Sequence, residues 1–87
     1  MNTQFALLAR FESPTIPLKH VCVEFFGIQH KTAEAQAKSG EFPIPTFKMR
    51  NSERSPTLVH IEDLAKHIDA QLTKAREEWA SVNNTDA

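Results

Sequence analysis

Glycine, cysteine and tyrosine are scarce in this chain, and long apolar runs are missing. Its 87 residues include 2 glycines, 1 cysteine and no tyrosine. The single cysteine, Cys22, has no partner for an internal disulfide, and its neighbours Val21 and Val23 predict a buried thiol. No apolar run approaches the roughly 20 residues of a membrane helix, and Met1 to Phe5 lack the basic region of a secretory signal. We therefore expect a cytoplasmic protein that contacts no membrane.

Sequence motifs typical of metal sites and catalytic centres are also missing. The four histidines and Cys22 do not fall into a CxxC or HExxH spacing. The acidic pairs Glu62-Asp63 and Glu77-Glu78 are better explained by helix ends and solvation than by acid-base catalysis. A chain of 87 residues builds one small core and leaves little room for an internal active site. The sequence predicts no enzyme, no cofactor and no metal.

Charge is distributed unevenly along the chain. The net charge is -1, whereas nucleic-acid binders usually carry a basic surface. Residues 16–57, however, carry a net charge of +2, and residues 58–87 carry -3. The middle of the chain is therefore the part that suits an anionic partner.

Both glycines follow a short amphipathic segment. Leu18, Val21, Cys22 and Phe25 make one apolar face, and Gly27 is placed to end that helix in a left-handed conformation. A second run of good helix formers extends from Lys31 to Lys38, with Gly40 just beyond it. The two segments predict a helix-turn-helix from about Pro17 to Lys38.

The flanking segments complete a small domain. Thr3 to Phe11 has helical spacing, and residues 42–49 and 57–61 predict two strands around a polar turn. A last helix begins near Glu62. We expect a mainly α fold with a small β-hairpin, a winged helix-turn-helix, in one domain over residues 1–80 with a disordered tail over residues 81–87.

The second helix of the pair is the candidate recognition helix. Its alanines at 33 and 37 face the first helix, which leaves a polar face opposite them. Gln36 is suited to an adenine edge, Ala35 to a thymine methyl, and the lysines to phosphates. The alternative is an ordinary solvated helix face. The predicted DNA-binding residues are Lys31, Thr32, Ala35, Gln36, Lys38 and Ser39.

The predicted hairpin supplies a second candidate contact, a wing on the DNA backbone or in the minor groove. Arginine suits a narrow minor groove because its guanidinium is weakly hydrated. The alternative is a solvated turn. The wing residues are Lys48, Arg50, Asn51, Ser52 and Arg54.

The last helix carries an apolar stripe longer than a small core needs. Its far end is a candidate for self-association, and the alternative is packing on the N-terminal segment. The residues concerned are Leu72, Ala75 and Trp79.

The order of these elements resembles the winged-helix DNA-binding domains of the MerR and excisionase superfamily, and in detail the PrtN-type pyocin activator family of prophages. The resemblance covers the chain up to about Asp69. The motifs that carry it are Met1-Asn2-Thr3, Ile16-Pro17-Leu18 with Phe25-Phe26-Gly27, Gly40-x-x-Pro43-Ile44-Pro45, Arg50-Asn51-Ser52-x-x-Ser55 and Val59-His60-Ile61-x-Asp63-Leu64-Ala65.

The resemblance implies a transcription activator that binds double-stranded DNA in a mobile element. Its implied partners are DNA, further copies of the chain, and RNA polymerase or an integrase. One alternative is an excisionase, or recombination directionality factor, that bends attachment-site DNA to direct an integrase. A second alternative is a phage protein-interaction module that binds no DNA.

Overall fold

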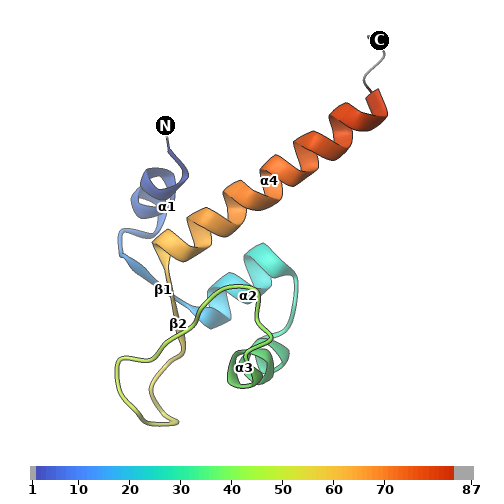
Figure 1. Cartoon of the computed structure of the whole chain (residues 1–87). Coiled ribbons are helices and arrows are strands. Elements are labelled where there is room, and N and C mark those ends of the chain that lie inside the picture. Colours follow the sequence, from blue (N-terminus) through green and yellow to red (C-terminus); the bar gives the residue numbers. More distant parts are fainter. Residues whose placement is uncertain (1, 84–87) are drawn as a thin grey trace.

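The computed structural model describes residues 2–83, which form helices and one small sheet (Figure 1). The elements follow one another as α1 (Thr3–Phe11), β1 (Thr15–Pro17), α2 (Leu18–Phe26), α3 (His30–Ser39), β2 (Leu58–His60) and α4 (Ile61–Asn83). The predicted class, mainly helical with a small antiparallel sheet, is confirmed. None of these helices is long and apolar enough to cross a membrane.

The helix boundaries follow from local sequence signals. The Asn2 side chain accepts a hydrogen bond from the Phe5 N–H at 2.9 Å and so caps the start of α1. Gly27 ends α2 with φ +66° and Gly40 ends α3 with φ +79°. Both lie in the left-handed region that glycine enters without steric cost. Helices are therefore present at three predicted positions, namely residues 3–11 and the two segments that end at Gly27 and Gly40.

The sheet pairs different segments from those predicted. Leu58–His60 was expected to pair with the segment after Gly40, but its strand partner is Thr15–Pro17, with Ile16 opposite Val59. The expected pairing is reduced to a single bridge between Phe47 and Leu58. Pro43 and Pro45 contribute to this result because proline cannot donate a ladder hydrogen bond. The sheet thus ties the start of α2 to the start of α4.

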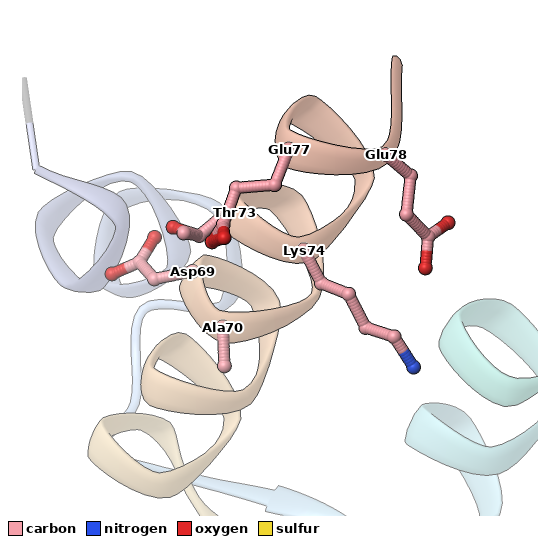
Figure 2. A pocket seen from close by; sticks show the side chains of 6 residues that line it. All are labelled: Asp69, Ala70, Thr73, Lys74, Glu77 and Glu78. Atoms are coloured by element: carbon pink, nitrogen blue, oxygen red, sulfur yellow. The ribbon is translucent and has the colours of Figure 1, made fainter. Parts of the chain in front are cut away.

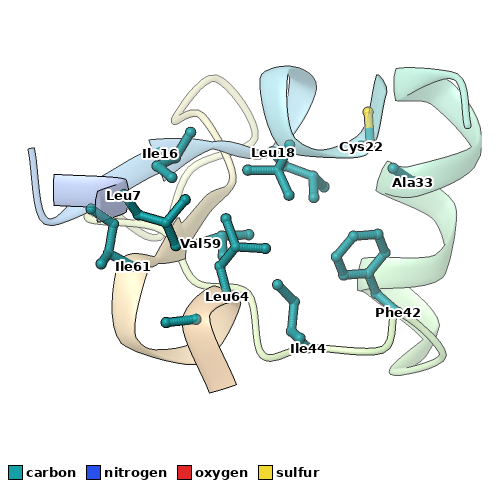
Figure 3. Packing of buried hydrophobic residues seen from close by; sticks show 12 residues of the cluster. Leu7, Ile16, Leu18, Cys22, Ala33, Phe42, Ile44, Val59, Ile61 and Leu64 are labelled. Atoms are coloured by element: carbon teal, nitrogen blue, oxygen red, sulfur yellow. The ribbon is translucent and has the colours of Figure 1, made fainter. Parts of the chain in front are cut away.

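The core lies where α1, α2, the sheet and the first turns of α4 meet (Figure 3). Leu18, Val21, Cys22, Val59 and Leu64 have no exposed surface. The predicted buried thiol is confirmed, and burial raises the pKa of Cys22 above its usual value of 9.0. α2, α3 and the base of α4 therefore share one core.

α4 is longer than expected and extends away from this core (Figure 1). It runs through Asn83, so residues 81–83 are helical, whereas the sequence predicted that a disordered tail begins at Ser81. The remainder of that predicted tail, residues 84–87, lies outside the described residues. The helix gives the domain a longest dimension of 57 Å.

Candidate nucleic-acid interface

α3 presents a polar face to solvent. Ala33 is fully buried and Ala37 packs against the core, as the alternation of small residues predicted. The opposite side carries the candidate recognition residues, of which Gln36 is half-buried at the flank and the others are exposed: Lys31, Thr32, Ala35, Lys38 and Ser39. The predicted face is therefore accessible along the whole helix.

Ser39 and Gln36 also take part in hydrogen bonds at the C-terminal end of α3. The Ser39 hydroxyl donates to the Gln36 carbonyl oxygen at 3.2 Å. The same carbonyl accepts the N–H groups of Glu41 at 2.9 Å and Phe42 at 3.2 Å. Ser39 thus has its proton engaged and offers a ligand only an acceptor oxygen, whereas the Gln36 main chain fixes the turn after the helix.

The loop after Phe47 is closed at its base by two main-chain hydrogen bonds. The Phe47 N–H donates to the Leu58 carbonyl at 3.0 Å, and the Leu58 N–H donates to the Phe47 carbonyl at 2.7 Å. We call residues 48–57 the wing loop. The loop extends beyond the sheet toward the same end of the domain as α3 (Figure 1).

Ser52 organises the wing loop from within. Its hydroxyl accepts the Arg54 N–H at 3.2 Å, and its carbonyl accepts the Lys48 ammonium at 3.4 Å and the Ser55 N–H at 3.1 Å. Among the predicted wing residues Ser52 is half-buried, and the exposed ones are Lys48, Arg50, Asn51 and Arg54. Ser52 therefore shapes the loop, while the other four are available to a ligand.

A cleft of about 300 Å³ lies between α3 and the wing loop. It is lined by basic side chains from three parts of the chain: Lys19 at the start of α2, His30 at the start of α3, and Lys48 and Arg54 of the wing loop. Sequence reasoning did not assign Lys19 or His30 to the interface. The β1–β2 pairing, which joins Pro17 to Leu58, brings them beside the loop.

The carboxylate of Glu34 in this cleft contacts the side chains of Thr57 and His30. One oxygen accepts the Thr57 hydroxyl at 3.1 Å, and the other lies 3.1 Å from Nε2 of His30. The contact with His30 becomes an ion pair when the imidazole is protonated. Glu34 therefore lies on the wing-loop side of α3, away from the polar face, and fastens α3 to the residue before β2.

Two of the other three histidines have defined contacts. His60 Nδ1 accepts the Glu62 N–H at 3.0 Å at the start of α4, and the ring of His67 lies 5.3 Å from the ring of Phe26. Across residues 2–83 no three His, Cys, Asp or Glu side chains are grouped to hold a metal ion. The acidic Glu62 pairs with Lys66 at 3.2 Å.

The candidate self-association residues are accessible. Leu72 is 44% exposed and Trp79 is 68% exposed, and Ala75 between them is exposed as well. Another side of the same helix is polar: Figure 2 shows a shallow depression there, lined by Asp69, Ala70, Thr73, Lys74, Glu77 and Glu78. α4 is therefore amphipathic beyond the core.

The features that bear on function are thus two consecutive helices, α2 and α3, with an exposed polar face on α3 and a basic loop beside it. The profile of the family described as pyocin activator protein PrtN matches residues 3–75, which include every element up to the middle of α4. The chain belongs to this family. Comparisons with curated proteins and with solved structures gave no match.

Proposed function

We propose that this protein is a transcription activator of a prophage that binds double-stranded DNA as a winged helix-turn-helix domain. Family membership supports the activator role, since the family is described as pyocin activator protein PrtN. The observation that carries DNA binding is the polar face of α3, where Lys31 and Lys38 stand exposed. The helix order, the Phe47–Leu58 bridge and the loop between them support the winged arrangement.

In this proposal α3 enters the major groove. Its exposed face bears two ammonium groups, one hydroxyl donor at Thr32 and the methyl of Ala35. Lysines suit phosphate oxygens, which set register, whereas an amide and a methyl group suit base edges. Gln36 at the flank is the residue assigned to an adenine edge, and Lys31 and Lys38 are assigned to the backbone.

The cleft between α3 and the wing loop suits the phosphate backbone that borders the groove. Lys19, His30, Lys48 and Arg54 converge there from α2, α3 and the loop. No side chain caps the start of α3, so its first N–H groups add partial positive charge to the same place. Glu34 and Glu53 also line the cleft and lower its net positive charge.

A salt series with matched variants tests this proposal. Binding of the full chain to prophage promoter DNA is measured by fluorescence anisotropy for Lys31→Ala/Lys38→Ala and for Lys66→Ala/Lys74→Ala, which removes the same charge from α4. Each lost phosphate contact flattens the plot of log K against log salt by about 0.9. We expect a change of about 1.8 per bound copy for the α3 pair and a much smaller change for the α4 pair. Equal changes would refute the assignment of α3.

Base recognition is tested separately with Gln36→Ala. Loss of a bidentate contact to adenine should reduce discrimination at one base pair by about 1–3 kcal/mol, with other positions unaffected. Selection of binding sites from random DNA, for wild type and variant, measures the effect. An unchanged sequence preference would show that Gln36 does not read a base.

A further inference from the structure

The outer part of α4 lacks support from its own domain. Burial along this helix ends at Ile68, and residues 69–83 are all exposed. At 1.5 Å per residue this segment is about 22 Å long. The segment propagates from the packed base of α4, but no packing within the described domain covers its apolar residues.

The exposed segment continues one apolar seam. Steps of four and three residues alternate along Ile68, Leu72, Ala75, Trp79 and Val82, which is the spacing of a coiled-coil interface. Trp79 is 68% exposed and Val82 is 84% exposed. Polar side chains flank the seam, with Asp69 and Arg76 along one edge and Gln71 and Glu78 along the other. The segment is built to pack against another helix.

We propose that a second copy of this chain covers the seam, with the two α4 helices antiparallel and Leu72 packed on the partner's Ala75. The charges along the seam favour this alignment. It places Asp69 beside the partner's Arg76, a pair of opposite charge, and Gln71 beside the partner's Glu78, where an amide can donate to a carboxylate. Because the interface is two-fold symmetric, each contact occurs twice.

A parallel pair lacks these contacts. It would place Trp79 on the partner's Trp79, and it would set Asp69 beside the partner's Leu64 rather than beside a cation. The charged edges therefore distinguish the two orientations.

An apolar groove at the base of α4 receives the largest side chain in this arrangement. The groove has a volume of about 410 Å³ and is lined by Phe25, Phe26, Leu64, His67, Ile68 and Gln71. The antiparallel alignment brings the partner's Trp79 onto Ile68, at the edge of this groove. An indole in an aromatic groove buries a large apolar area, so Trp79 is the expected anchor of the interface.

Sedimentation equilibrium of the full chain tests the dimer. Trp79→Ala should raise the dimer dissociation constant at least tenfold, as expected for a tryptophan that anchors an interface in a groove. Because Trp79 is largely exposed within one copy, the substitution leaves the fold intact, which circular dichroism checks. Lys74→Ala on the polar side is the control and should not change the constant. A wild-type chain that stays monomeric at high micromolar concentration would overturn the proposal and point to a different partner.

A charge exchange tests the alignment. Asp69→Arg and Arg76→Asp should each weaken the dimer, since each places like charges together, and the double variant should restore it. Asp69 also accepts a hydrogen bond from the Thr3 hydroxyl at 2.5 Å, which the double variant does not restore. Recovery in the double variant therefore reports the intermolecular pair, and failure to recover would overturn the antiparallel alignment.

Cysteine cross-linking gives an independent test of orientation. Leu72→Cys and Ala75→Cys proteins, mixed and oxidised, should form a disulfide between unlike chains, since these positions share a layer of the seam. Ala75→Cys alone should cross-link poorly, because its two copies are offset along the axis beyond disulfide reach. Efficient cross-linking of Ala75→Cys alone would instead demonstrate a parallel pair. The native Cys22 is fully buried and serves as the unreactive background.

Discussion

Three helices of this domain end at a residue with a left-handed backbone conformation. Two of these residues are glycines and the third is a glutamate. Gly27 and Gly40 have φ +66° and +79°, while Glu12 adopts φ +53° at the end of α1. Apart from the adjacent residues of the chain, a Cβ atom at either glycine would meet no atom within 4 Å. The effect of a substitution there is therefore the local backbone strain alone, free of any clash with neighbours.

This geometry predicts stability changes of opposite sign. An L-residue in the left-handed region costs about 1–2 kcal/mol, and alanine recovers about 0.4–1 kcal/mol by restricting the unfolded chain. Gly27→Ala and Gly40→Ala should each destabilise the domain by about 1 kcal/mol. By the reverse reasoning, Glu12→Gly should stabilise it by up to about 1 kcal/mol, since the Glu12 side chain is exposed.

Urea unfolding followed by far-UV circular dichroism measures these changes. With a slope of about 1 kcal/mol per molar urea, each midpoint should move by about 1 M. Gly40→Asn is the matched control and should lose less than Gly40→Ala, because asparagine tolerates the left-handed region better. A neutral or stabilising alanine at both glycines, or a destabilising Glu12→Gly, would refute the reasoning.

Two further substitutions probe the core and its link to α3. Burial raises the pKa of Cys22, so the folded state holds the thiol proton more tightly and stability should fall as pH rises above about 9; urea titrations at successive pH values should show a smaller fall for Cys22→Ala. Thr57→Val removes the hydroxyl that Glu34 accepts at 3.1 Å and should cost about 1.5–3 kcal/mol. Thr57→Ser, which keeps the hydroxyl, should cost less by the same assay.

Local signals made the helices and the face of α3 predictable. Helix ends depend on residues such as Asn2, Gly27 and Gly40, whose effects act within one turn. The exposure of Lys31 and Lys38 follows from helical period once Ala33 is assigned to the core. These features can be predicted without knowing which distant residues contact one another.

The sheet and the cleft depend on contacts that the sequence does not mark. Thr15–Pro17 resembles a break because Pro14 precedes it and Pro17 ends it, yet Ile16 pairs with Val59, which follows α2 and α3 in the chain. That pairing brings Lys19 and His30 beside the wing loop, so both were missed. The length of α4 was underestimated because the polar residues after Ala80 resemble a disordered tail. Val82 alone extends the apolar stripe of the helix beyond Trp79.

The junction between β2 and α4 has a mechanical consequence. β2 ends at His60 and α4 begins at Ile61 without an intervening linker, and main-chain hydrogen bonds join Pro14 to Ile61 and Thr57 to Leu18 at either end of the strand pair. The base of the wing loop and the first turn of α4 are therefore joined through one strand, with no linker residues between them. A partner that binds α4 is coupled to the wing loop through the sheet and not through a flexible connection.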